Sequence, residues 1–250
     1  DDGAEAAPAE AGDEGGGHPL VLGKGKIAIH AAIEVNLSKD AVAKPFSIAP
    51  DVWYGVTDKI SAGLVHSTMG STGFVAGAGR GLCLAGEDNG CAEVYDNVGV
   101  EALYLALGDG PLQVAANGGV VIHHLSDPMM TSLKLGVVGK YTMGKIIVAF
   151  TPNIWVGITE RDFNKEILNV PVSAMFAVNP KLAAGIQTGI MGPLDGFGDA
   201  WLLPLSVGAH YAISEQITAG AAFGLPALAG GPDGTGADMR SLQLFVGYML

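Results

Sequence analysis

The two cysteines of the chain, Cys83 and Cys91, lie close together in a segment rich in acidic side chains. So short a spacing favours a local disulfide in an oxidising compartment, with free thiols or metal ligation as the alternatives. On the chain-entropy model a loop this small contributes about 2.5 kcal/mol, less any strain. We expect the disulfide to stiffen the longest loop, residues 67–96.

Two other clusters contain residue types that bind metals. Acidic side chains between residues 87 and 96 offer the oxygen ligands that Ca²⁺ prefers, but their spacing matches no complete calcium loop. His123, His124, Met129 and Met130 offer imidazole and thioether groups that copper or zinc accept. Further methionines fall near the same rim: Met69, Met191 and Met239. Methionine more often fills apolar gaps, so we expect no metal site and no cofactor.

Hydrolysis requires a serine, a histidine and an orienting group within hydrogen-bond reach on one surface. Ser206 and His210 share one strand face but lie four residues apart, or about 13 Å at strand rise. His66 falls on the apolar face of another strand, where the sequence gives it no partner. We therefore expect no enzymatic activity, and a lipid-modifying enzyme is the less favoured alternative.

The composition indicates how these residues are positioned. Of 250 residues, 49% are hydrophobic, only 15% are charged and 38 are glycine, whereas a soluble domain of this size needs a more charged surface. No apolar run reaches the roughly 20 residues of a membrane-spanning helix, because a charged residue, Asn or Gly interrupts each one. Closed β-barrels also satisfy every backbone hydrogen bond in lipid, so we expect a transmembrane barrel.

Alternation of apolar and polar residues is clearest between residues 25 and 37. Ile27, Ile29 and Ile33 share one face of this segment, and His30 and Glu34 share the other. The same pattern predicts twelve strands in all, at 25–37, 46–56, 59–67, 97–107, 112–123, 131–141, 145–158, 166–178, 181–190, 201–212, 216–225 and 239–250.

Short and long connections alternate along these strands, as in barrels with short periplasmic turns and longer extracellular loops. The tight connections are Thr57–Asp58, 108–111, 142–144, Asn179–Pro180 and Ser214–Glu215. The predicted fold is all-β: a closed, antiparallel, up-and-down transmembrane barrel of 12 strands with both termini periplasmic.

The domain organisation follows from the charge pattern. Residues 1–23 are expected to form an acidic, Ala/Gly-rich periplasmic tail, and residues 24–250 the barrel domain. The first 17 residues contain six acidic and no basic side chains, half of the net charge of −12. The acidic balance excludes a nucleic-acid partner, which requires a basic face.

One sequence pattern occurs three times, at residues 54–63, 176–185 and 211–220: an aromatic residue, a turn, an apolar residue and a glycine. Aromatic residues at equivalent places on the even-numbered strands predict a girdle at the periplasmic headgroup level. Its members are Tyr54, Tyr104, Tyr141, Phe176, Tyr211 and Tyr248. A sparser outer girdle comprises Phe46, Trp201 and Phe223. A soluble β-sandwich, the alternative, does not explain the common height of these rings.

The polar phase of the strands is expected to face a lumen, because a charge at the bilayer midplane would cost roughly 2–4 kcal/mol. Acidic residues on the first, second and fourth strands face two lysines on the sixth, which suggests a transverse field. The alternative is that these groups only hydrate the interior. The candidate lumen and selectivity residues are Glu34, Asp51, Trp53, Glu101, Asn117, Lys134, Lys140, Asn153, Trp155 and His210.

The sequence resembles the broad class of Gram-negative outer-membrane β-barrels over residues 24–250. The segment 242–250 is similar to the terminal strand by which that class is recognised for assembly, although the last residue is Leu250 where Phe is common. Tyr54-Gly-Val-Thr-Asp also resembles periplasmic turns of outer-membrane transporters linked to aromatic-compound degradation. The resemblance implies an outer-membrane location, contact with lipid and lipopolysaccharide, and assembly by the barrel-assembly machinery through the last strand.

Twelve strands give a backbone radius of roughly 12 Å, which leaves room for a narrow pore between small inward side chains. The expected function is a channel or porin for passive diffusion of small solutes through a polar lumen. The alternative is a plugged barrel that serves as a structural or adhesion scaffold. The sequence specifies neither the solute nor the oligomeric state.

Overall fold

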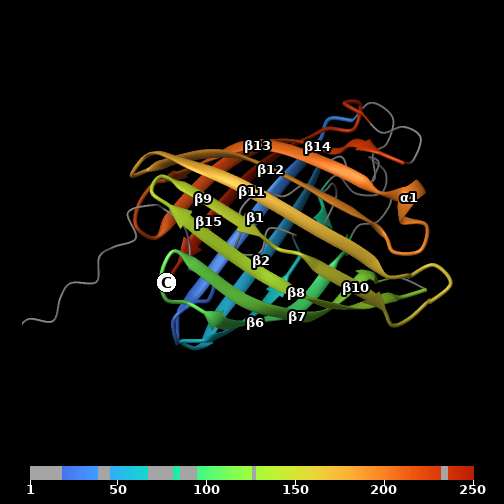
Figure 1. Cartoon of the computed structure of the whole chain (residues 1–250), viewed down its shortest axis with the longest axis horizontal. Helices are drawn as coiled ribbons and strands as arrows, with labels where there is room; N and C mark the ends of the chain where they lie inside the picture. Colours follow the sequence, from blue (N-terminus) through green and yellow to red (C-terminus); the bar gives the residue numbers. More distant parts are fainter. Residues whose placement is uncertain (1–18, 39–45, 67–80, 85–94, 126–127, 232–235) are drawn as a thin grey trace, which may run out of the picture.

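The computed structural model describes residues 19–38, 46–66, 81–84, 95–125, 128–231 and 236–250, which form a closed barrel of steeply tilted strands (Figure 1). The elements are β1 (Ile27–Asn36), β2 (Phe46–Thr57), β3 (Ile60–Val65), β4 (Gly81–Cys83), β5 (Tyr95–Asp96), β6 (Val98–Leu107), β7 (Leu112–His124), β8 (Met130–Met143), β9 (Ile146–Phe150), β10 (Asn153–Gly157), β11 (Ile167–Asn179), β12 (Leu182–Pro193), α1 (Phe197–Ala200), β13 (Leu202–Ala212), β14 (Ile217–Gly230) and β15 (Ser241–Met249). Among these residues, no helix is long and apolar enough to cross a membrane.

The ring closes at β1, which pairs antiparallel with β2 on one side and with β15 on the other. Every strand of the ring is bonded to the next strand along the chain, so the predicted antiparallel barrel of 12 strands is confirmed. β9 and β10 together form one of the twelve, since both pair with β8 and β11. The predicted strand 145–158 is therefore interrupted at Thr151 and Pro152, where proline has no N–H to donate to the sheet.

β4 and β5 lie outside the ring and were not predicted. β4 pairs with β2 through Ser47 opposite Cys83 and Ile48 opposite Leu82, and β5 pairs with β4. These strands are three and two residues long, too short for alternation to identify them. They extend the sheet beside β2 beyond the point where β3 ends at Val65.

Alternation in burial separates the two faces of the wall. Along β15, Ser241, Gln243 and Phe245 are buried, whereas Leu242 and Leu244 are exposed. Large apolar side chains are therefore exposed on the outside and polar ones are buried inside, the inverse of a soluble protein.

The repeated glycines make room for large inward side chains on the neighbouring strand. Gly63 lies directly opposite Trp53, and Gly220 directly opposite Phe245. A Cβ atom at Gly63 would lie 2.5 Å from the Trp53 ring, and one at Gly220 would lie 2.1 Å from the Phe245 ring. The glycine of the repeat thus has a packing role in the lumen wall.

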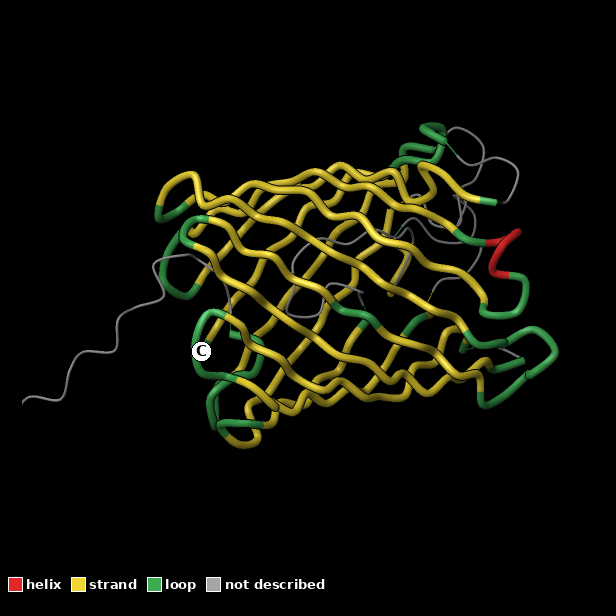
Figure 2. The backbone as a smooth tube through the Cα atoms, in the orientation of Figure 1, coloured by secondary structure: helices red, strands yellow, loops and turns green. Residues whose placement is uncertain are grey.

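The two ends of the barrel differ. The tight turns β2–β3, β6–β7, β8–β9, β11–β12 and β13–β14 gather at the end that carries the C terminus, the turn end (Figure 2). α1 and the longer connections lie at the opposite end, the loop end (Figure 2).

An apolar cluster fills the interior towards the turn end. It contains Leu20, Val21 and Leu22, which precede β1 and are only 3%, 7% and 6% exposed. They pack with inward side chains of several strands: Ala28, Trp53, Val65, Leu103, Ala115 and Val138. The segment just before β1 therefore lies inside the barrel.

Candidate functional site

The structure places the candidate lumen residues on the inner face of the wall. Lys134 and His210 are half-buried, and the other eight side chains are buried: Glu34, Asp51, Trp53, Glu101, Asn117, Lys140, Asn153 and Trp155. Whether any of them selects solutes stays a prediction.

Glu101 on β6 and Lys134 on β8 form an ion pair on the inner face of the wall. The Lys134 ammonium lies 2.8 and 2.9 Å from the two carboxylate oxygens of Glu101, and Asn117 donates to the same carboxylate at 3.0 Å. β6 and β8 both flank β7, so these charges come from one side of the barrel and not from opposing walls. Because Lys134 neutralises Glu101 locally, these two residues contribute little to the transverse field expected between acidic and basic walls.

Four further candidate lumen residues are hydrogen-bonded: Glu34, Asp51, Asn153 and Trp155. Gln243 donates to a Glu34 carboxylate oxygen at 2.7 Å, and the His66 backbone N–H donates to Asp51 at 2.7 Å. The Trp155 indole N–H donates to Asn153 at 2.6 Å. These bonds restrict the motion of the inward side chains, since a buried polar group that loses its hydrogen-bond partner costs free energy.

His66 lies inside the barrel, not on the apolar outer face where its phase would place it. β3 ends at Val65, and the following bend turns His66 inward to 6% exposure. Its ring nitrogens contact the Pro50 carbonyl oxygen and, at 2.5 Å, the Tyr95 hydroxyl. In the described part of the chain, both ring nitrogens are therefore engaged by these two oxygens and not by a serine.

The predicted aromatic girdle faces outward near the turn end. Tyr54, Tyr104, Tyr141, Phe176 and Tyr211 are all exposed, and Tyr248 is half-buried. Of the outer set, Phe46 and Phe223 are exposed and Trp201 is half-buried. Their contact with lipid headgroups stays a prediction.

Several candidate ligands fall partly outside the described residues. Cys83 is buried in β4, but Cys91 is not among the described residues. The acidic residues 87–93, Met69 and the His124 side chain also lie outside them. Where the chain is described, no group of three or more His, Cys, Asp or Glu side chains is placed to hold a metal ion.

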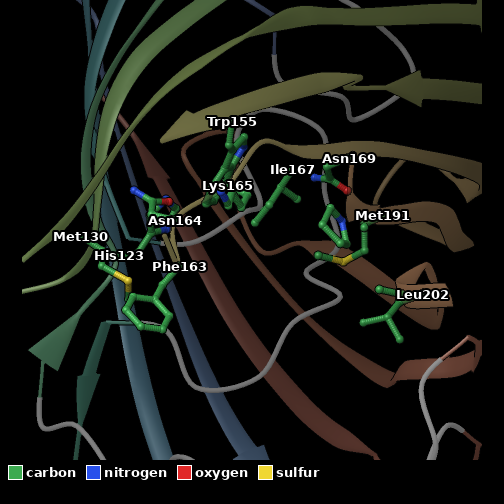
Figure 3. Close-up of a pocket in the computed structure, with 13 residues that line it drawn as sticks. His123, Met130, Trp155, Phe163, Asn164, Lys165, Ile167, Asn169, Met191 and Leu202 are labelled. Carbon is green, nitrogen blue, oxygen red and sulfur yellow. The ribbon is translucent and has the colours of Figure 1, made fainter. Parts of the chain in front are cut away.

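A cavity of about 540 Å³ opens at the loop end. Figure 3 shows Met130 and Phe163 on one side, Met191 and Leu202 on the other, and Trp155 above. The His123 ring stacks on Trp155, with centroids 4.6 Å apart and planes inclined by 23°. The strands that supply this lining run from β7 to β13, which are successive neighbours around the ring, so the curvature of the wall brings their side chains together.

The connection between β10 and β11, residues 158–166, is fixed against the wall of this cavity. Asn164 is buried, accepts from the Ser132 hydroxyl at 3.0 Å and donates to the Thr131 carbonyl at 2.8 Å. Arg161 bonds to the Glu166 carboxylate at 2.7 Å, and this bond holds the pKa of Glu166 below its usual value. No sequence motif marked Asn164, because its partners lie over 30 residues away.

The sequence did not predict that Leu20–Leu22 lie inside the barrel, although Gly55 is a signal of it. The repeat has alanine at 177 and 212 but Gly55 at the equivalent position. A Cβ atom at Gly55 would lie 2.0 Å from the Gly23 carbonyl oxygen, so the glycine admits the segment that enters the barrel. The backbone N–H of Gly25 also donates to the Gly55 carbonyl at 2.8 Å.

Solved structures share this architecture. Neither a protein-family model nor a curated protein matches the sequence. A KdgM porin in complex with disordered oligogalacturonate is 7% identical, with a TM-score of 0.59 over 88% of this chain and 98% of the porin. The NanC porin is 10% identical, with a TM-score of 0.58 over 89% of this chain and 100% of the porin.

A third solved structure, the COG4313 outer membrane channel from Pseudomonas putida F1, is 13% identical, with a TM-score of 0.58 over 97% of this chain and all of that channel. At these identities the likeness concerns the fold. The chain thus has the fold of the Gram-negative outer-membrane porins and channels.

Proposed function

We propose that this protein is an outer-membrane channel for passive diffusion of small solutes. The observation that carries the proposal is the inverted wall, in which a closed ring of 12 strands exposes apolar side chains outside and lines its interior with hydrogen-bonded polar groups. A barrel with this wall suits a bilayer and gives polar solutes partners along the lumen. The shared fold of porins and channels supports the same function.

Passive permeation is tested with liposomes that contain the purified, refolded protein. Osmotic swelling in solutions of small sugars and amino acids should exceed that of protein-free liposomes and decrease as solute size rises. Swelling equal to that of protein-free liposomes for every solute would refute the proposal.

The position of Leu20–Leu22 favours a second candidate, a plugged barrel. These three side chains pack in the apolar cluster at the turn end, across the route a solute would follow. The plug hypothesis requires that removal of residues 1–22 create a current absent from the intact chain. Removal of residues 1–18 is the matched control, because it deletes every acidic residue of the segment and retains the buried leucines.

We further propose that both termini face the periplasm and that the last strand is recognised by the assembly machinery. We also propose that the chain divides into residues 1–23, of which Leu20–Leu22 lie inside the barrel, and the barrel domain 24–250. Lipid and lipopolysaccharide would cover the outer face. The Cys83–Cys91 disulfide belongs with these proposals, and a non-reducing mass measurement that finds two free thiols would refute it.

A further inference from the structure

We propose that the cavity at the loop end binds a small aromatic carboxylate, such as the benzoate ion, before the solute enters the lumen. This inference rests on the proposed channel function and names a solute class for it. The cavity is defined here as the space between His123, Trp155, Phe163, Lys165, Asn169 and Met191.

The size and lining of the cavity favour a compact apolar ring. A volume of about 540 Å³ lies within the range of roughly 300–1,000 Å³ typical of small-molecule sites. Phe163, Ile167 and Leu202 supply carbon surface, and Met130 and Met191 supply thioethers on two sides (Figure 3). Thioether sulfur packs favourably near aromatic rings.

A planar π surface is already built into the wall. His123 and Trp155 stack at 4.6 Å, and the indole N–H is bonded to Asn153, which in turn donates to the Thr151 carbonyl. The indole is therefore held in one orientation. An aromatic ring bound beside this pair gains from ring–ring contact beyond burial of its area, whereas a saturated ring gains only the burial.

The charge of the cavity favours an anionic substituent. Lys165 is the one Lys, Arg, Asp or Glu among the described residues that line it. The neighbouring charges of Arg161 and Glu166 neutralise each other at 2.7 Å, and Glu160 and Asp162 in the same loop do not contribute to the lining. The Asn169 amide adds a hydrogen-bond donor to the same side of the cavity as Lys165 (Figure 3).

Preformed walls make binding possible without a large rearrangement. Asn164 ties the loop that carries Phe163 and Lys165 to β8 by bonds to Ser132 and Thr131. Phe163 is 82% exposed although its loop is fixed, so its ring remains available for contact with a solute. A fixed site loses less conformational entropy on binding than a mobile one.

Binding is tested by isothermal titration calorimetry of the full chain in detergent micelles with benzoate, with protein-free micelles as the blank. Benzoate should bind with one-to-one stoichiometry. Cyclohexanecarboxylate, which has the charge without the aromatic ring, and benzyl alcohol, which has the ring without the charge, should bind several-fold more weakly. Heat equal to the blank, or equal affinity for benzoate and cyclohexanecarboxylate, would overturn the proposal.

Variants separate the two parts of the site. Lys165→Met should weaken benzoate about threefold to fivefold, as expected for an exposed charge, and leave benzyl alcohol unchanged. Trp155→Leu should weaken both probes about fivefold. His123→Leu, on a half-buried side chain, is the second variant should the buried Trp155 be needed for folding. Lys181→Met, in an exposed turn at the other end, is the matched control and should bind as the parent does.

Failure of this inference differs from failure of the channel function. A protein that swells liposomes but does not bind benzoate remains a channel without this site. A protein that binds benzoate but passes no solute retains the site and is not a channel. Unchanged benzoate affinity in both Lys165→Met and His123→Leu would place the probe elsewhere and refute the assignment.

Discussion

The backbone N–H of Leu22 donates a 2.8 Å hydrogen bond to Ser61 Oγ on β3, inside the barrel. Ser61 is only 1% exposed, and Leu22 packs there with inward side chains of neighbouring strands. This contact ties the segment before β1 to the wall and narrows the turn end of the lumen. On the proposed channel function, we expect this segment to limit the passage of solutes.

Gly55→Ala should displace this segment. The new Cβ atom would meet the Gly23 carbonyl oxygen at 2.0 Å, and a backbone atom cannot move aside as a flexible side chain does. We expect a higher single-channel conductance than in the parent protein. Gly118→Ala is the control, because its Cβ atom would meet only ordinary contacts at 3.8 and 3.9 Å. Equal conductance in the parent and Gly55→Ala would show that the segment does not limit flow.

Lys134→Met should make the lumen more selective for cations. The substitution leaves the Glu101 carboxylate, 6% exposed, with Asn117 as its donor and removes the ammonium that neutralises it. Because Lys134 is partly exposed, the cost in unfolding free energy should be about 1–3 kcal/mol, below that of a fully buried pair. Reversal potentials in a salt gradient measure the selectivity. The double variant Glu101→Gln, Lys134→Met should return the potential towards the parent value, and failure to do so would assign the selectivity to other groups.

Gly220→Ala should destabilise the barrel by about 1–3 kcal/mol through overpacking. Its Cβ atom would lie 2.1 Å from the Phe245 ring, which His210 also contacts at 4.5 Å between centroids. Urea unfolding in lipid vesicles measures the change, and Gly118→Ala again serves as the control. Equal stability of the two alanine variants would show that the Phe245 ring does not need the space left by the glycine.

The sequence predicted those parts of the fold in which apolar and polar residues alternate with a period of two. The alternation from Ile27 onward predicted each strand of the ring because a period of two determines which side chains face lipid. The segment Leu20–Leu22 is too short to show a period, and it follows an acidic stretch that suggested a solvated tail. Gly55 is a sequence signal that this segment enters the barrel. Its role is clear only once the position of the Gly23 backbone beside it is known.

The cavity could not be predicted for a different reason. His123, Trp155 and Met191 come from β7, β10 and β12, and their proximity depends on the pairing and curvature of these strands and on the Asn164 contacts of the loop after β10. The sequence grouped His123 with Met130 as possible metal ligands. The structure instead stacks His123 on Trp155 and separates Met130 from Met191 across the cavity (Figure 3).

The Arg161–Glu166 pair predicts a response of the loop to acid. Its hydrogen bond lowers the pKa of Glu166 below the usual glutamate value, so the folded loop favours the charged form. The stabilisation is complete above the usual glutamate pKa and is lost as the pH falls through the lowered pKa. A carboxyl NMR titration should show the lowered midpoint in the parent and a higher one in Arg161→Gln, because the Arg161 hydrogen bond is the largest cause. The same midpoint in both proteins would exclude Arg161 as the cause.

Single-channel conductance in planar bilayers tests the channel function most directly, with the full chain compared with chains that lack residues 1–18 or 1–22. We predict a small steady conductance for the full chain, little change on removal of 1–18, and a several-fold increase on removal of 1–22, because only the last deletion removes Leu20–Leu22 from the lumen. The absence of current from all three proteins would contradict the account.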